Sequence, residues 1–233
     1  MKEKIIIIGG KGTAIVIAEQ LIHAIEKCNY NAEFLGFSFW DPSMTEVLGR
    51  PILFQDYEDM KKKYLKYDDV KFIFQLYRSD VIGERCEWRD RINIPLKKYC
   101  NFVHPFAYVA GSAKMGLGNV VLANSVINSG AQIGNFNTFN SGDLLGHDTT
   151  IGDSNFFAAH ASLGSNVHIG DMNFFGINCC IKNMTHMGDK NIVGQCANVV
   201  KNVEDGITLI GNPAKPLIKK IVEHDTITDR TFL

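Results

Sequence analysis

Apolar residues recur at every sixth position along the second half of the chain. From Val103 to Val199 each sixth residue is apolar, and no insertion breaks the register. An amphipathic helix repeats after about 3.6 residues and a strand after two, so neither element explains a period of six. The pattern instead predicts a β-helix whose short flat faces each take one hexapeptide, with the large residue inside and a small residue at the crowded corner.

A second period, of 18 residues, predicts three faces in each coil. The positions that show it are Met115, Ile133, Ile151, Ile169 and Met187, and each is followed by a glycine and, three residues after that, by an asparagine. The next face carries the series Phe139, Phe157 and Phe175. Because glycine and asparagine tolerate the left-handed backbone conformation, we expect these glycines and asparagines at the sharp corners.

The first hundred residues alternate between strand and helix patterns. "KIIIIGGKGTAIVIAEQLIHAIEK" is typical of a strand, a glycine turn and a helix. A second strand should end near Asp41, a third should span 70–79, and a helix is expected over 80–98, running into Pro95. This order predicts a small parallel α/β domain of Rossmann-like type at residues 1–100, followed by a β-helix at 101–211 and a tail at 212–233.

The glycine turn is a candidate phosphate site. Gly10 and Gly12 precede the first helix, but Ile15 stands where a third glycine would complete a dinucleotide motif, so NAD is not expected. Backbone N–H groups at a helix N-terminus bind phosphate, although a purely structural tight turn also explains these glycines. Trp40 and Asp41 end the second strand, where a nucleotide base could stack or bond.

Charge balance, apolar runs and cysteine spacing limit the partners and the compartment that the protein can have. The 24 basic and 25 acidic side chains nearly balance, which argues against nucleic acid or a membrane surface as the partner. The apolar start is too short for a signal peptide, and no run reaches the length of a membrane span. The six cysteines include no CxxC pair, so a disulfide framework is not expected. We therefore expect a soluble protein of the reducing cytoplasm.

Several stretches resemble one family, the hexapeptide-repeat sugar acyltransferases with an N-terminal nucleotide-sugar domain. This group contains sialic-acid O-acetyltransferases and UDP-4-amino-sugar N-acetyltransferases. The similar segments are "IIIIGGKG", "FLGFSFWDP", "NSGDLLGHDTTIGD", "NVHIGDMNFFGINCCI" and the closing "GNPAK" at 211–215. The resemblance implies a left-handed β-helix, acetyl transfer from acetyl-CoA to a nucleotide-linked amino sugar, and a homotrimer with the pantetheine arm between neighbouring β-helices.

The same resemblance implies roles for individual residues. His147 matches the family's catalytic base, Asp148 should orient its ring, and Asn140 should lie near the acceptor sugar. Imidazole suits the task, because a general base must take the proton of the attacking nitrogen near neutral pH. The family's second histidine, which the resemblance places near the acetyl group or the cofactor, falls at Phe156, so the chain departs from the pattern there while Phe156 stays a candidate for binding acetyl-CoA. His160 is a candidate for partly replacing it.

Further candidates for binding acetyl-CoA follow in the later coils. Backbone N–H groups at Gly164 and Ser165 are candidate donors to the oxyanion, and Gly176, Ile177 and Gln195 are candidate contacts of the pantetheine arm. Phe136, Phe156 and Phe174 point outward by register and would leave apolar surface for a neighbouring subunit.

His168 and His186 stand 18 residues apart and should stack on adjacent coils. Zinc needs three or four ligands, and no third ligand shares their column, so we expect a surface pair and no metal. Three other functions stay open. They are O-acetylation of sialic acid or another sugar hydroxyl, nucleotide-sugar binding without catalysis, and a γ-type carbonic anhydrase, which needs three metal-binding histidines.

Overall fold

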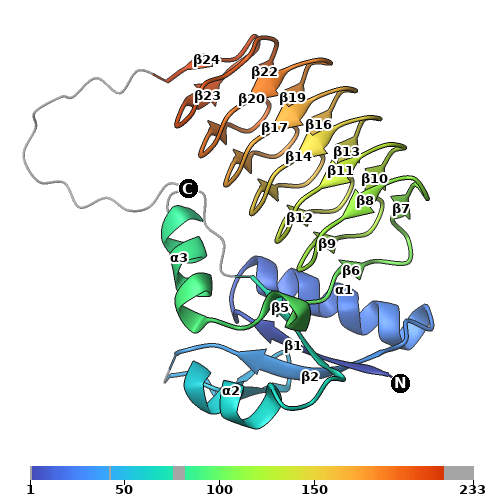
Figure 1. Ribbon diagram of the computed structural model, residues 1–233, viewed down its shortest axis with the longest axis vertical. Coiled ribbons are helices and arrows are strands. Elements are labelled where there is room, and N and C mark those ends of the chain that lie inside the picture. The colour runs from blue at the N-terminus through green and yellow to red at the C-terminus, as the bar shows by residue number, and fades with distance from the viewer. Residues whose placement is uncertain (1, 42, 76–81, 218–233) are drawn as a thin grey trace, which may run out of the picture.

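The computed structural model describes residues 2–41, 43–75 and 82–217, which form an N-terminal α/β domain and a β-helix stacked above it (Figure 1). The N-terminal sheet has the order β3-β4-β2-β1-β5. Its strands are β1 (Glu3–Ile8), β2 (Ala32–Ser38), β3 (Glu46–Val47), β4 (Arg50–Phe54) and β5 (Val70–Phe74). They pair in parallel except for β3, which is antiparallel to β4.

Helices cover the N-terminal sheet and explain its apolar central strand. The helices are α1 (Thr13–Lys27), α2 (Tyr57–Tyr64), α3 (Ile82–Ile92) and the short 3₁₀ helix η1 (Leu96–Lys98). Ile5 and Ile7 pack in a cluster with α1, whereas Ile6 and Ile8 pack in a second cluster with Met60 of α2. A parallel strand with both faces covered is apolar throughout, and the side chains of Ile5 to Ile8 are fully buried.

Several element boundaries differ from those predicted. The second strand ends at Ser38 rather than near Asp41, and the third ends at Phe74, with 76–79 outside the described residues. The helix expected over 80–98 is two elements, because Asn93 takes a positive φ and the following Ile94 precedes a proline, which disfavours helical backbone. The sequence pattern also missed β3, β4 and α2, which lie in a mostly polar segment.

The second half of the described chain is a left-handed β-helix with three faces per coil. Face 1 contains β6 (Phe102–Val103), β9 (Val120–Val121), β12 (Thr138–Phe139), β15 (Phe156–Phe157), β18 (Phe174–Phe175), β21 (Ile192–Val193), β23 (Thr208–Ile210) and β24 (Lys215–Pro216). Face 2 contains β7 (Tyr108–Val109), β10 (Val126–Ile127), β13 (Leu144–Leu145), β16 (Ser162–Leu163), β19 (Cys180–Ile181) and β22 (Asn198–Val199). Face 3 contains β8 (Lys114–Met115), β11 (Gln132–Ile133), β14 (Thr150–Ile151), β17 (His168–Ile169) and β20 (His186–Met187).

The glycines and asparagines of the 18-residue repeat lie in the corner between face 3 and face 1, as predicted, but they do not take the left-handed conformation. The positive φ angles fall every sixth residue, from Gly118 and Asn124 to Lys190 and Cys196, and not at the glycines and asparagines of the 18-residue repeat. Glycines such as Gly134 are needed for space, because a Cβ there would collide with the side chain of Asp153 on the next coil. The repeated asparagines are buried and form a ladder, in which, for example, the Asn137 N–H donates to Asn119 Oδ1 at 2.8 Å.

The inward positions behave as the hexapeptide register predicts. Phe139, Phe157 and Phe175 form a stack with ring centroids 4.6 and 4.5 Å apart, and all three are buried. A second inward column holds small residues, except that Asp143 lies there between Ser125 and Ala161 with only 3 % of its surface exposed. A carboxyl group is therefore buried inside the β-helix.

Replacing Phe157 by alanine is expected to lower the free energy of unfolding by about 3 kcal/mol, because the cavity left in the stack is filled only partly by movement of Phe139 and Phe175. Urea unfolding followed by circular dichroism measures this change. Phe174→Ala is the matched control, since Phe174 points outward on the same face and is only half-buried. A loss no larger for Phe157→Ala than for the control would contradict the stacked core.

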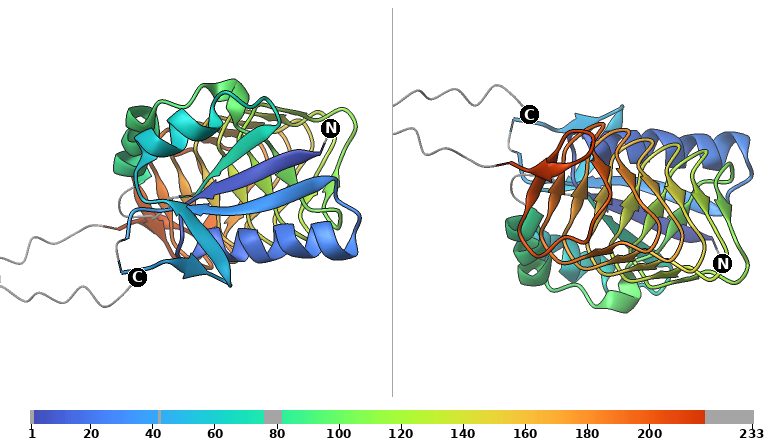
Figure 2. Two further views of the ribbon diagram at one scale, coloured as in Figure 1. Left: turned by 90° about the horizontal axis from the view of Figure 1, so that it is seen from below. Right: turned by 90° about the horizontal axis from the view of Figure 1, so that it is seen from above.

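The N-terminal domain packs against the lower coils of face 1 (Figure 2). Gln75 Nε2 donates to Thr138 Oγ1 at 2.8 Å, and Arg89 of α3 donates to Ser154 Oγ at 2.7 Å. The Arg89 guanidinium also lies 4.3 Å from the centroid of the Phe136 ring. Phe136 and Phe156 are consequently buried, so the expectation that they leave apolar surface outside is wrong.

Candidate active site

Two corners of the β-helix carry the predicted site residues. Corner one connects face 1 to face 2 and holds 140–142, 158–160, 176–178 and 194–196 on successive coils. Corner two connects face 2 to face 3 and holds 146–148 and 164–166. The two corners flank face 2, so residues on them stand at opposite edges of the same face.

His147 and Asp148 form a hydrogen-bonded pair at corner two, directly after β13. The distance from His147 Nδ1 to Asp148 Oδ2 is 2.8 Å, and both side chains are more than half exposed. Asp148 has a φ of 56°, which turns its carboxyl group back over the preceding coil. There it lies against Gly130, where any Cβ would collide with Asp148 Oδ1. No other described residue bonds His147 Nε2, so this nitrogen is available to accept a proton from a substrate.

Asn140 lies at corner one and is not brought next to His147 within the chain. Its Nδ2 donates to the backbone oxygen of Phe157 at 2.6 Å, which fixes the amide on the outer edge of the coil. Its neighbour Ser141 accepts a hydrogen bond from Gln20 Nε2 of α1 at 2.9 Å. Asn140 therefore stands where the N-terminal domain meets the β-helix.

Gln20 is a contact that the sequence did not indicate. Its Oε1 accepts the Ala123 N–H at 2.8 Å, while its Nε2 reaches Ser141 on the next coil. One side chain thus ties α1 to two successive coils at corner one. Nothing in the helical pattern of α1 distinguishes this glutamine from a solvent-facing residue, so only the tertiary arrangement reveals it.

His160 also lies at corner one, one coil beyond Gly142. It has a φ of 62° and is exposed, and its N–H donates to the Ser141 backbone oxygen at 3.2 Å. The Nδ1 and Cε1 edge of its ring lies so close to Gly142 that a Cβ there would collide with it. Within the described residues, no hydrogen bond engages Nε2 of this exposed ring.

The backbone at Gly164 and Ser165 does not supply free oxyanion donors. The Gly164 N–H donates to the Ile181 oxygen at 2.9 Å, and the Ser165 N–H donates to Asn183 Oδ1 at 3.1 Å. Both donors are engaged within the coil stack, so the expected oxyanion role of these two groups is corrected. Their contact with other parts of acetyl-CoA stays a prediction.

Corner one does present unused donors near the predicted pantetheine contacts. Within the described residues, the backbone N–H groups of Ala159, Ile177 and Gln195 have no acceptor. The Ile177 side chain is 48 % exposed, whereas Gly176 is buried and its N–H donates to Val193. A row of free N–H groups beside exposed apolar surface fits an amide-containing chain such as pantetheine. Phe156 is buried and stacks on Phe174 at 5.3 Å.

The glycine loop before α1 leaves one N–H of the helix N-terminus available. The Ala14 N–H donates to the Lys11 oxygen at 3.3 Å and the Ile15 N–H to the Gly12 oxygen at 3.0 Å, whereas the Thr13 N–H has no acceptor among the described residues. Gly12 precedes the helix with a φ of 54°, no side chain caps it, and no acidic residue occupies the first turn. Gly10 is needed because a Cβ there would collide with the Phe39 ring. These features suit an anion at the N-terminus of α1, although the phosphate role of the loop stays a prediction.

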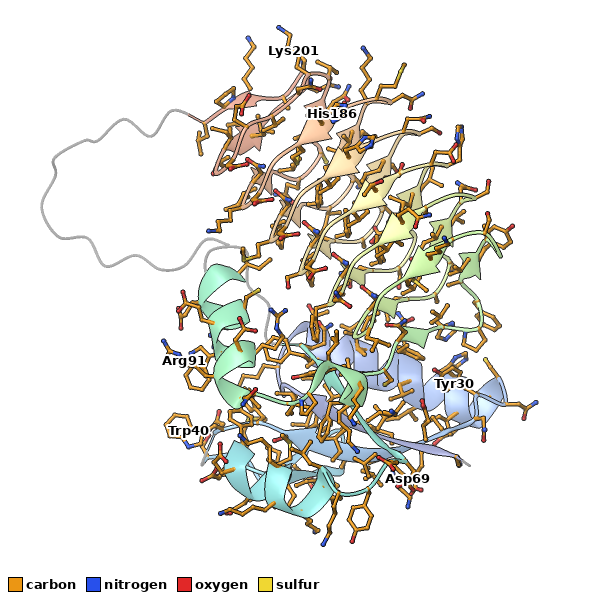
Figure 3. All side chains as sticks on the ribbon, viewed as in Figure 1. Tyr30, Trp40, Asp69, Arg91, His186 and Lys201 are labelled. Atoms are coloured by element: carbon orange, nitrogen blue, oxygen red, sulfur yellow. The ribbon has the colours of Figure 1, made fainter. Side chains whose placement is uncertain are left out.

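Asp41 and Trp40 lie next to this loop. Lys11 Nζ bonds Asp41 Oδ2 at 2.7 Å, and this hydrogen bond, with those from Ser43, lowers the pKa of Asp41 to about 2. Trp40 is 66 % exposed and lies at the outer edge of the N-terminal domain (Figure 3). Asp41 thus already has a cationic partner from the same loop, whereas the indole ring is free to stack on a ligand.

His168 and His186 form the predicted surface pair on face 3. Their ring centroids are 4.6 Å apart and the rings are nearly parallel. Across residues 2–41, 43–75 and 82–217, no group of three metal-ligating side chains is close enough to hold a metal ion. The helices of the same described part include none long and apolar enough to cross a membrane.

Solved structures of sugar acetyltransferases share this architecture. The acetyltransferase domain of PglB from Neisseria gonorrhoeae FA1090 is 25 % identical, with 93 % of this chain and 100 % of that chain covered and a TM-score of 0.78. A histidine-to-asparagine mutant of perosamine N-acetyltransferase from Caulobacter crescentus, in complex with CoA and GDP-perosamine, is 25 % identical, with coverages of 94 % and 98 % and a TM-score of 0.78.

WeeI from Acinetobacter baumannii AYE is 23 % identical, with 93 % of this chain and 100 % of that chain covered and a TM-score of 0.76. No protein-family model matches the chain, and no curated protein matches it. The structural matches span both parts of the chain, so they include the α/β domain as well as the coils. The chain therefore has the fold of the hexapeptide-repeat sugar N-acetyltransferases, as the resemblance in its sequence predicted.

Proposed function

We propose that the protein transfers the acetyl group of acetyl-CoA to the amino group of a nucleotide-linked sugar. The observation that carries this proposal is the His147–Asp148 pair, which stands exposed at a corner of the β-helix with His147 Nε2 free. The fold supports it, because PglB and perosamine N-acetyltransferase, which share this fold, are acetyltransferases, and the second was solved with CoA and GDP-perosamine.

The residues supply the groups that the reaction needs. The amine nitrogen attacks the thioester carbonyl carbon, and His147 Nε2 takes the proton that the nitrogen loses. Asp148 bonds Nδ1, which holds the ring with its free nitrogen outward and stabilises the charged imidazolium. The carbon–sulfur bond then breaks and CoA leaves as the thiolate. Asn140 and the N-terminus of α1 bind the sugar and its nucleotide phosphate.

A homotrimer completes this site. Asn140 and His147 stand on different corners of one coil, so a single substrate reaches both only where two chains meet. The free N–H groups of Ile177 and Gln195 would then line the seam along which acetyl-CoA lies. We place the reaction in the cytoplasm, since all six cysteines are free thiols, as is usual in a reducing compartment.

Incubation with acetyl-CoA and a panel of acceptors tests the proposal. The panel contains UDP-, GDP- and dTDP-linked 3-amino and 4-amino sugars together with free sialic acid, and mass spectrometry detects the added acetyl group. We expect a product on one nucleotide-linked amino sugar. Acetylation of sialic acid alone would establish the O-acetyltransferase instead. Binding of a nucleotide sugar without any product would establish a non-catalytic binding protein.

A further inference from the structure

Face 2 of the β-helix and its two corners expose large apolar side chains. Its exposed residues include Tyr108 at 59 % and Leu144 at 42 %, and Ile177 and Met184 flank it at 48 % and 70 %. Face 3, by contrast, exposes only Lys, Gln, Thr and His side chains at its outward positions. Exposed apolar surface of this kind marks a protein interface, and the incomplete site on its two corners identifies the occupant as a second copy of the chain.

Cyclic symmetry then decides which residues meet. Suppose that face 2 of each copy turns toward a symmetry axis that runs parallel to the β-helix axis. Corner two of one chain then lies against corner one of the next chain, with equivalent coils at the same height along that axis. A coil rises by about 4.8 Å, the spacing of neighbouring strands. On that spacing the partner subunit's Asn140 lies about 2 Å below the level of His147, and the partner subunit's His160 about 3.5 Å above it.

His160 is built to present its ring at this seam. Its positive φ and the glycine beneath it repeat the construction that places Asp148 over Gly130. The Nδ1 edge rests against Gly142, the residue is exposed, and no hydrogen bond from a described residue engages Nε2. At corner two the N–H groups of Gly164 and Ser165 are engaged within the coil stack. Corner one, where His160 lies beside the Ala159 N–H that has no acceptor among the described residues, is therefore the side of the seam that can supply an oxyanion donor.

We propose that His160 is a catalytic residue supplied across the interface, and this inference rests on the proposed function. With hydrogen on Nε2, the partner subunit's His160 donates a hydrogen bond to the thioester carbonyl oxygen while His147 takes the amine proton. Negative charge grows on that oxygen as nitrogen attacks, so a donor placed there stabilises the transition state more than the ground state. No bond to His160 forms, and its hydrogen stays on the ring.

Kinetics of His160→Ala give the first test. We expect kcat to fall roughly 10- to 100-fold with little change in KM for acetyl-CoA, which is the signature of a lost oxyanion donor. His160→Gln, which keeps an N–H donor, should recover part of the loss. His168→Ala is the matched control, because His168 is an exposed histidine on face 3 away from the seam. Full activity of His160→Ala would overturn the proposal.

Mixed oligomers test the contribution across the interface. Differently tagged His147→Ala and His160→Ala chains are co-expressed and purified through both tags. If the two histidines act from different chains, about one interface in three of a trimer that carries both tags regains both residues, and activity returns. If both histidines act from the same chain, no site contains both of them. The activity of the mixed oligomers then stays as low as that of the two single variants. That second result overturns the proposal and leaves the transferase function intact.

Cross-linking decides the geometry even if no acceptor sugar is acetylated. In a background with the exposed Cys180 and Cys196 replaced by serine, one chain carries His147→Cys and the other His160→Cys. A short bis-maleimide should join the two differently tagged chains. Replacing the second variant by His168→Cys should abolish the product. Failure of the first pair to cross-link overturns the proposed seam independently of the assay.

Discussion

Replacing His147 by alanine is expected to lower kcat for acetyl transfer by about 100-fold or more, because the attacking nitrogen then loses its proton without a positioned base. Within residues 2–41, 43–75 and 82–217, no group donates a hydrogen bond to His147 Nε2, and removal of the ring leaves the backbone contact from Asn166 N–H to the His147 oxygen in place. The coil should therefore keep its structure. Steady-state kinetics of the variant beside the wild type measure the effect.

Asp148→Asn is the informative companion to this variant. Asparagine keeps the size of the side chain but removes the negative charge that faces the His147 ring at 2.8 Å. We expect a smaller loss of kcat, of about 10-fold, since the base remains but its imidazolium form is less stabilised. A His147→Ala protein as active as the wild type would exclude His147 as the base without excluding the transferase.

The size of the His147 effect also separates the two kinds of acceptor. A sugar hydroxyl is a weaker nucleophile than a neutral amine and depends more on removal of its proton in the transition state. Loss of the base should consequently cost more for O-acetylation than for N-acetylation. A comparison of both acceptor types with the same variant therefore reports on the natural acceptor.

The β-helix was predictable because one class of side chain, the apolar residues, marks its register. Every sixth residue fills the interior, so the apolar period gives the coil length and the inward positions, and the resemblance of "NSGDLLGHD" to one family singles out His147 among the outward ones. The stacked pair His168 and His186 follows from the same register and is confirmed. What repeats along the chain can be counted without knowing the structure.

The left-handed positions within the corners were not predictable, because residue type does not set them. Positive φ occurs at Phe136, Met172 and Lys190, none of which favours that conformation. Their N–H groups donate to backbone oxygens one coil below, as from Phe136 to Leu117 and from Met172 to Asp153. Hydrogen bonds between coils impose the positive φ. They join residues about one coil apart in the sequence, so the local residue pattern does not indicate them.

The same limit applies to what covers the outward residues. The hexapeptide register correctly predicts that Phe156 points away from the β-helix axis. Whether its ring is exposed depends on the N-terminal domain, which lies outside the repeat. Tyr108, Leu144, Ile177 and Met184, by contrast, stay exposed when the N-terminal domain is in place.

Replacing Asp143 by asparagine is expected to stabilise the protein, and increasingly so as pH rises. Burial raises the pKa of the Asp143 carboxyl to about 9, despite N–H groups of Ala161 and Asn140 that favour its charged form. Its Oδ1 accepts the Ala161 N–H at 2.8 Å, while Oδ2 is buried without a partner among the described residues. The group is therefore neutral inside the coil at ordinary pH.

The sign of the effect follows from proton binding in the two states. An unfolded aspartate has a pKa of about 4, so the folded chain holds the proton more tightly. The wild-type protein accordingly loses stability as pH rises from about 4 to about 9, whereas a neutral side chain has no such dependence. The difference in free energy of unfolding between Asp143→Asn and the wild type should grow by roughly 1 kcal/mol for each pH unit across this range.

Urea unfolding at several pH values and fixed protein concentration measures this difference, since association of the chains would otherwise contribute. At about pH 3 the aspartate is neutral in both the folded and the unfolded chain, so that measurement is the internal control for packing differences between the acid and the amide. Asp143→Ser provides a second variant, because Ser125 already occupies the same inward column one coil below. Parallel stability curves for the wild type and both variants would show that Asp143 is ionised in the folded chain, and hence that water or a cation reaches the interior of the coil.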